Sequence, residues 1–153
     1  MITVRKMLLE DIDAVMIVDR DSFSIPWSRE SFFLEVESRL SSYVVVEEDS
    51  GQIIGYGGFY LIIDQVEITN IAVLGKYRGQ GIGKSILEAL IKLAIVGGGK
   101  VVNLEVRASN EAAKAMYLSY GFNLVGSRKG YYQLPSEDAL LLSLVLEEGR
   151  LDD

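Results

Sequence analysis

In the first half of the chain, hydrophobic residues alternate with polar ones in some segments, as in a strand, and recur every three or four residues in others, as in a helix. The spacing predicts a strand at 2–7, helices at 8–23 and 31–36, and strands at 43–46 and 53–63. Pro26 separates the two helices, because proline removes a backbone donor and restricts the residue before it. Ser28 is a typical N-cap for the second helix, and Asp49 to Gly51 forms a turn between the two later strands.

The second half alternates more regularly between the two periods. The spacing predicts a strand at 65–74, a helix at 84–96, a strand at 100–106, a helix from Ser109 or Asn110 to 120, and strands at 122–132 and 139–146. A glycine-rich loop at 76–83 precedes the first of these helices, and Gly97 to Gly99 ends it. Residues 135–138 separate the last two strands, and 147–153 form a loose tail.

This order of elements predicts one α/β domain. Helices and strands alternate over 65–122, which is typical of parallel strands joined by a crossover. Short turns join the early and the late strands, which favours antiparallel pairing there. We expect a mixed central β-sheet of about seven strands flanked by about four helices. The domain would span 1–147, and 148–153 would be a short acidic tail.

Composition removes several kinds of chemistry. The 153 residues include no Cys and no His, which excludes disulfides, a cysteine nucleophile, imidazole bases and the commonest metal ligands. We therefore expect no metal, and catalysis would fall to carboxylates, hydroxyls, amines or the backbone. The net charge of −7 argues against a nucleic-acid partner and is ordinary for solubility. The N-terminus lacks a signal peptide and no apolar stretch is long enough for a membrane, so we expect a cytoplasmic protein.

The glycine-rich loop at 78–83 is a candidate anion site. Glycines between a strand and a helix allow positive φ and close approach, and N–H groups at a helix N-terminus favour an anion. The spacing fails the dinucleotide fingerprint, and it fails the P-loop because the opening glycine would be Arg78. Arg78 and Lys84 could add charge to a pyrophosphate or be solvated loop cations. A plain glycine-rich turn stays the structural alternative.

Several motifs together resemble one family. Arg78-x-x-Gly81-x-Gly83 matches the pyrophosphate-binding motif of GNAT acetyltransferases, which bind acetyl-CoA. The run Leu104 to Asn110 and the pattern Tyr117-x-x-x-Gly121-Phe122 resemble the RimI branch, whose members acetylate the N-terminal α-amine of a ribosomal protein. Residues 22–28 and 131–139 are also similar to that branch. The resemblance covers nearly the whole chain in the same order and implies a GNAT fold; the glycine run at 97–99 and the acidic tail depart from it.

The resemblance implies roles for three side chains. Glu105 would be the general base, Glu67 a second base or a water-holding residue, and Tyr117 the proton donor to the CoA thiolate. An α-ammonium has a pKa of ~8, so a carboxylate base can deprotonate it more easily than a lysine ammonium, whose pKa is ~10.4. With no Cys or His, direct attack in a ternary complex is the simplest route. Read from the pattern alone, Glu105 and Glu67 are solvated strand carboxylates and Tyr117 is a core tyrosine.

The cofactor residues implied by the resemblance lie on three elements. The full set is Ile71, Ala72, Val73, Arg78, Gly79, Gln80, Gly81, Ile82, Gly83, Lys84, Asn110 and Tyr117. Residues 71–73 would offer backbone groups to the pantetheine and the acetyl oxygen, or would simply be a buried strand. Asn110 would touch the cofactor arm or serve as an N-cap.

The resemblance also implies an acceptor groove between two loops. Ile25, Pro26 and Trp27 would form one wall, and Tyr131 and Tyr132 the other. Alternatively, Trp27 could be an ordinary core residue, and the two tyrosines could be strand residues without a binding role. The leading prediction is an acetyl-CoA-dependent protein N-terminal acetyltransferase, as monomer or homodimer. An acetyltransferase of small amines and a non-catalytic acyl-CoA-binding or nucleotide-binding sensor are the alternatives.

Overall fold

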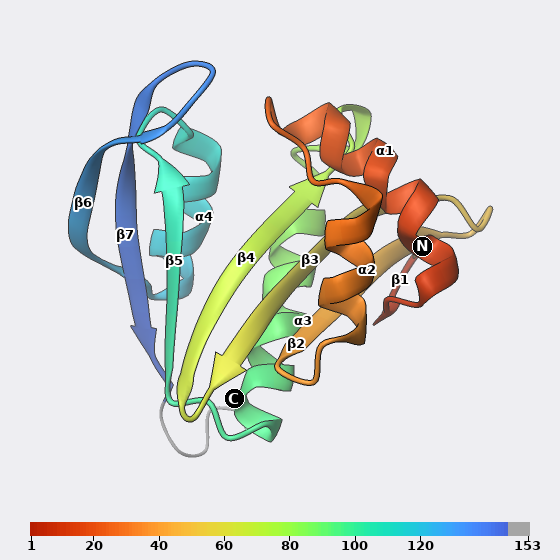
Figure 1. The fold of residues 1–153 in the computed structure, drawn as a ribbon, viewed down its shortest axis with the longest axis horizontal. Coiled ribbons are helices and arrows are strands. Elements are labelled where there is room, and N and C mark those ends of the chain that lie inside the picture. The colour runs from red at the N-terminus through yellow and green to blue at the C-terminus, as the bar shows by residue number, and fades with distance from the viewer. Residues whose placement is uncertain (147–153) are drawn as a thin grey trace.

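Seven strands form one mixed sheet in the computed structural model, which describes residues 1–146 (Figure 1). The strands are β1 (Ile2–Lys6), β2 (Ser41–Glu48), β3 (Ile53–Ile62), β4 (Gln65–Val73), β5 (Val101–Arg107), β6 (Asn123–Tyr132) and β7 (Glu137–Val145). The helices are α1 (Ile12–Ser22), α2 (Arg29–Glu37), α3 (Ile82–Val96) and α4 (Glu111–Tyr120), with 3-10 turns at Leu9–Asp11 and Gly75–Tyr77. The strand order is β1-β2-β3-β4-β5-β7-β6, and only β4 and β5 pair in parallel.

The predicted α/β fold with a mixed seven-stranded sheet is confirmed, and most differences lie at element ends. Helix α3 begins at Ile82 instead of residue 84, because Gly81 takes a left-handed conformation (φ 81°) and caps it. Strand β7 begins at Glu137 instead of residue 139, because Glu137 still pairs with Tyr132 of β6. The first predicted helix divides into a 3-10 turn and α1, and β2 starts two residues earlier. The predicted acidic tail lies outside the described residues.

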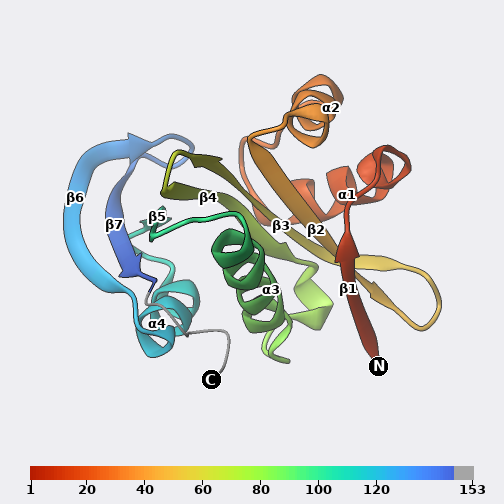
Figure 2. The same ribbon diagram turned by 90° about the horizontal axis from the view of Figure 1, so that it is seen from below.

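Helices cover both faces of the sheet. Figure 2 shows α1 and α2 on one face and α3 and α4 on the other. Two glycines of β3 leave room for neighbouring side chains. A Cβ on Gly57 would lie 2.5 Å from Ile86, so this glycine lets α3 approach the sheet, and a Cβ on Gly58 would lie 2.2 Å from the ring of Tyr43 on the neighbouring strand β2. Within residues 1–146, no helix is both long and apolar enough to span a membrane.

Strands β4 and β5 separate soon after they meet. They pair only over Gln65–Glu67 and Val101–Asn103, and towards their carboxyl ends they diverge (Figure 1). A bulge contributes to the divergence: the β3–β4 register shifts after Gly58, so Thr69 has no partner in the ladder. The facing edges of β4 and β5 beyond this point therefore have backbone groups that do not pair with each other.

A buried polar network joins the first helix to the centre of the sheet. Asp19 is 1% exposed and accepts hydrogen bonds from the Tyr56 hydroxyl at 2.5 Å and the Trp27 backbone N–H at 2.8 Å. The Asn70 amide donates to the Tyr56 hydroxyl at 2.7 Å. Because a buried carboxylate must be paired to be tolerated, the network fixes the 23–28 loop against β3 and β4.

Candidate active site

A cavity of about 840 Å³ opens between the diverging ends of β4 and β5. Its lining comes from the α1–α2 loop, β3, β4, β5, α4 and the end of β6. It brings together nine of the residues predicted from the sequence: Ile25, Trp27, Glu67, Ile71, Glu105, Asn110, Tyr117, Tyr131 and Tyr132. Pro26, Ala72, Val73 and the 78–84 loop are not among the described residues that line it.

Two carboxylates face each other across the point of divergence. Glu105 lies between buried Leu104 and Val106 and is itself half-buried, so strand alternation turns it away from the core. Burial raises the pKa of Glu67, and the negative charge of Glu105 raises it further. The Glu105 side chain forms no hydrogen bond or ion pair with any residue of 1–146. Besides Asp19, which is bound by Tyr56 and Trp27, the cavity therefore holds two carboxylates, Glu67 and Glu105, whose negative charges repel each other.

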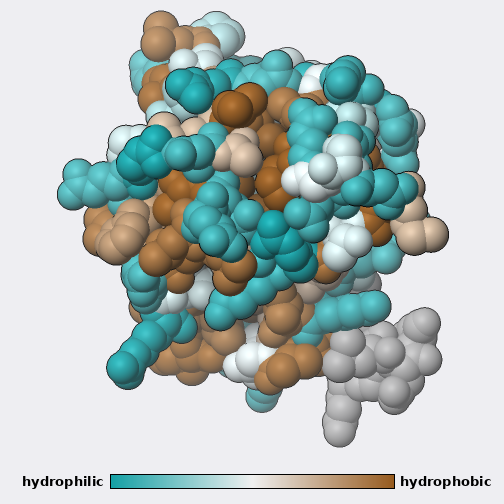
Figure 3. Space-filling view, turned by 90° about the vertical axis from the view of Figure 1, so that its right-hand side faces the viewer, coloured by the Kyte–Doolittle hydropathy of each residue, from teal (hydrophilic) through white to brown (hydrophobic). Residues whose placement is uncertain are grey.

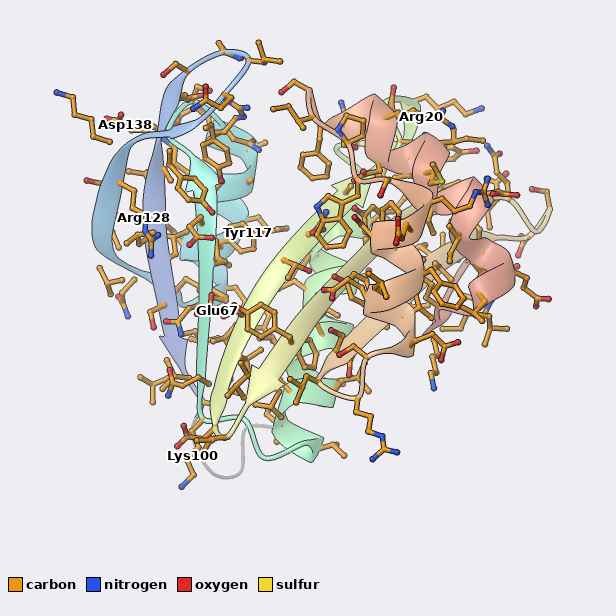
Figure 4. All side chains as sticks on the ribbon, in the orientation of Figure 1. Arg20, Glu67, Lys100, Tyr117, Arg128 and Asp138 are labelled. Carbon is orange, nitrogen blue, oxygen red and sulfur yellow. The ribbon has the colours of Figure 1, made fainter. Side chains whose placement is uncertain are left out.

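Tyr117 projects from α4 into the same cavity (Figure 4). Its ring is 6% exposed and packs edge-on against Phe122 at 5.5 Å, as a core tyrosine does. Its hydroxyl has no hydrogen-bond partner within the described residues. Burial raises the pKa of Tyr117, so the hydroxyl keeps its proton at neutral pH and can donate it.

The 78–84 loop presents its backbone N–H groups at the start of α3. Gly79 and Gly81 have φ values of 78° and 81°, and open space lies where a Cβ would stand on either. Within residues 1–146, the N–H groups of 79–84 have no hydrogen-bond partner. Unpaired N–H groups at a helix N-terminus suit an anion, so this segment fits the predicted pyrophosphate cradle.

The Arg78 side chain forms contacts that the sequence did not predict. Its Nε donates to the Val73 carbonyl at 2.9 Å, and its Nη2 donates to the Ser22 hydroxyl at 3.2 Å and to Asp21. The guanidinium thus ties the loop to the end of β4 and to α1, while about half of the side chain stays exposed to solvent. Lys84 is exposed and forms no ion pair with another described residue.

The two predicted acceptor loops flank the cavity. Trp27 packs against Phe32 at 5.2 Å and Tyr43 at 6.3 Å, so it is both a core anchor and part of the lining. Tyr131 and Tyr132 end β6, with their rings edge-on at 5.1 Å. These contacts give the cavity aromatic walls on both sides.

Several lining residues carried no signal in the sequence. Arg107 lies inside the matched run 104–110 but has no partner nearby in sequence that would indicate a role. Tyr60 and Arg128 lie on strands whose pattern predicts only pairing. Asn70 is buried, and its Oδ1 is a buried side-chain acceptor without a partner in the described part of the chain. The positions of these residues in the cavity depend on how the strands are aligned with one another. The pattern of residues along the sequence does not show that alignment.

A second cavity of about 650 Å³ lies between the end of β1, the start of β2 and α3. Apolar side chains of Val4, Val44 and Leu93 line it, together with Lys6 and Lys92, and no carboxylate does. The side of the molecule at the β1 edge, turned to the viewer in Figure 3, has hydrophobic patches set among hydrophilic side chains. This cavity lacks the acid–base groups of the first one. Among residues 1–146, no three His, Cys, Asp or Glu side chains gather closely enough to hold a metal ion.

Comparison with known proteins agrees with this geometry. A protein of Bacillus subtilis (strain 168), named as a candidate ribosomal protein bS18-alanine N-acetyltransferase, is 38% identical over 95% of this chain and 96% of its own. The ribosomal protein bS18-alanine N-acetyltransferase of Escherichia coli (strain K12) is 32% identical over 93% and 96%. The crystal structure of the Escherichia coli ribosomal-protein-S18-alanine N-acetyltransferase aligns with a TM-score of 0.89 at 30% identity, covering 96% of this chain and 95% of that one. The model of the acetyltransferase (GNAT) family matches residues 12–122, and the chain belongs to that family.

Proposed function

We propose that the chain transfers an acetyl group from acetyl-CoA to the N-terminal α-amine of a protein, by direct attack in a ternary complex. The observation that carries the proposal is that Glu67, Glu105 and Tyr117 line one cavity. The run of unpaired backbone N–H groups at the start of α3 supports it. The relatives named for acetylation of the ribosomal protein bS18 support a ribosomal protein as acceptor in the cytoplasm.

Acetyl-CoA would supply the activated acetyl thioester. The N–H groups of 79–84 would hold its pyrophosphate, since they are unpaired and open above two glycines of positive φ. The free edge of β4 at 71–73 would bond the pantetheine amides, because β5 no longer pairs with it there. Asn110, whose side chain accepts from the Ala113 N–H at 3.2 Å as an N-cap, also lines the cavity and would border the cofactor arm.

Glu105 and Glu67 would remove the proton from the attacking ammonium. An α-ammonium with a pKa near ~8 is already partly neutral at physiological pH, so a carboxylate acting through water suffices. The buried Tyr117 hydroxyl would protonate the leaving thiolate, since it has no other partner in the described residues. With no Cys or His in the chain, an acetyl-enzyme would need a Ser, Thr, Lys or carboxylate nucleophile, and direct attack is the simpler route.

Ile25, Pro26 and Trp27 on one side and Tyr131 and Tyr132 on the other would hold the first residues of the acceptor. Aromatic and apolar walls suit a side chain, and tyrosine hydroxyls can bond the peptide backbone. Tyr132 is half-buried, and burial together with the charge of Glu105 raises its pKa to about 12, so its hydroxyl stays neutral.

The direct test of the function is acetylation of a peptide that carries one free α-amine and one internal lysine. We expect mass spectrometry to locate the acetyl group on the α-amine, because the lysine amine, with a pKa near ~10.4, is almost fully protonated. A matched peptide with a blocked N-terminus should give little product. Rapid acetylation of polyamines or aminoglycosides without activity on any peptide would contradict the proposal and favour the small-amine alternative.

The role of Tyr117 is tested by Tyr117→Phe, which removes one hydroxyl from a packed ring. We expect kcat to fall about 10²–10⁴-fold, the usual scale for a lost general acid, while the Kd of acetyl-CoA stays the same in calorimetry. Tyr77→Phe is the control, since the Tyr77 hydroxyl bonds Glu48 and lies outside the cavity. An unchanged kcat in Tyr117→Phe would assign proton donation to another group.

The carboxylate pair predicts a specific pH dependence. Burial first, and then the charge of Glu105, raise the pKa of Glu67 above its ordinary value of 4.5, so Glu67 binds its proton to a higher pH than a free glutamate. In Glu105→Gln the second cause is removed, and the Glu67 pKa should fall while remaining raised by burial. Carboxyl ¹³C NMR titration measures both values. An unchanged Glu67 midpoint in Glu105→Gln would rule out the interaction.

A further inference from the structure

Three hydrogen bonds from the Arg107 guanidinium, at the end of β5, hold the β6–β7 hairpin. Its Nη1 donates to the Pro135 carbonyl at 3.1 Å and to Glu137 Oε1 at 3.2 Å, and its Nη2 donates to the Gln133 carbonyl at 2.9 Å. A guanidinium has five N–H donors in a rigid, planar arrangement. Here three hydrogen bonds go to two backbone carbonyls and one carboxylate of the hairpin. Arg107 therefore has little capacity left for a phosphate or a substrate carboxylate.

The same guanidinium also reaches the opposite wall of the cavity. Its Nη2 donates to the Ser24 hydroxyl at 3.4 Å, on the loop between α1 and α2. Within residues 1–146, no other hydrogen bond joins the 23–28 loop to β5, β6, β7 or their connections. Arg107 and Ser24 both line the cavity, so this contact joins two sides of its lining.

The backbone held by Arg107 is one that needs support. Leu134, between the two carbonyls that accept from Arg107, has a φ of 51°, which non-glycine residues rarely adopt. Glu137 adds a second anchor by accepting from the Ser109 backbone N–H at 2.5 Å. The Tyr132 ring lies 4.5 Å from the Arg107 Cζ, so the guanidinium also sets the place of this tyrosine.

We propose that Arg107 is a positioning residue for the acceptor: it fixes the tyrosine-bearing hairpin and joins it to the 23–28 loop on another side of the cavity lining. The inference rests on the proposed function for the identity of the acceptor, a peptide N-terminus. Arg107 touches neither the 78–84 loop nor the acid–base side chains by any hydrogen bond of the described residues. Its loss should therefore affect peptide binding and spare both acetyl-CoA binding and the chemical step.

Two variants separate the parts of this contact. Arg107→Lys keeps the positive charge but loses the fork, and should raise the peptide KM about tenfold. Ser24→Ala removes only the contact between the two sides of the lining from an exposed side chain, and should raise the peptide KM about two- to threefold. In both, kcat and the Kd of acetyl-CoA should stay within about twofold. Arg29→Lys is the matched control, since Arg29 pairs with Asp13 on the surface away from the cavity.

Hydrogen exchange of the free protein gives a readout that needs no activity. Amides of 130–137 should exchange faster in Arg107→Lys and remain as in the unmodified protein in Arg29→Lys. If Arg107→Lys fails to fold, the peptide KM of Ser24→Ala tests the proposed role instead. Unchanged exchange at 130–137, an unchanged peptide KM in Ser24→Ala, or a large loss of kcat or of acetyl-CoA binding would overturn the role. An unmodified protein inactive on every peptide would overturn the proposed function instead, while the exchange result would still decide whether Arg107 holds the hairpin.

Discussion

The parallel pair β4–β5 holds over only three positions, and the candidate site depends on this short contact. Gln65–Glu67 and Val101–Asn103 keep the two strands in one sheet, while the bulge at Thr69 turns β4 away from β5. Separation leaves two backbone edges without each other as partners, and unpaired backbone groups require a ligand or water. A longer pairing would close the cavity, and a shorter one would not keep the two halves of the sheet together.

The polar groups around this opening are divided between its two walls. The wall of α1, β3 and β4 is fixed by the buried Asp19 network, and the wall of β5, α4 and the β6–β7 hairpin is fixed by Arg107 and Glu137. Carboxylates from both walls meet at the base of the opening, where Glu105 raises the pKa of Glu67. The divergence of the strands thus allows two like charges to stand close together with access to solvent and to a substrate.

Periodicity and turn residues were enough to predict the order of elements, because apolar repeats set helices apart from strands, and Pro26, Gly51, Gly97 to Gly99 and Gly121 mark several of the boundaries. The family resemblance placed Glu67, Glu105 and Tyr117 in one site, and all three line the same cavity. What could not be predicted depends on tertiary register. Arg107 donates a hydrogen bond to Ser24, 83 residues away in the sequence, and Arg78 bonds the Val73 carbonyl and residues of α1. No local pattern encodes such contacts, since each requires two distant elements to be placed first.

The most direct test of the account is where a bisubstrate conjugate binds, with CoA joined through an acetyl bridge to the α-nitrogen of a peptide. Hydrogen-exchange mass spectrometry of the conjugate complex would measure protection along the chain. The account predicts protection of the 78–84 loop, of 71–73 on β4, of 104–107 on β5 and of the 131–133 segment together. Protection confined to the second cavity, near Val4, Val44 and Leu93, with no change where β4 and β5 diverge, would contradict it.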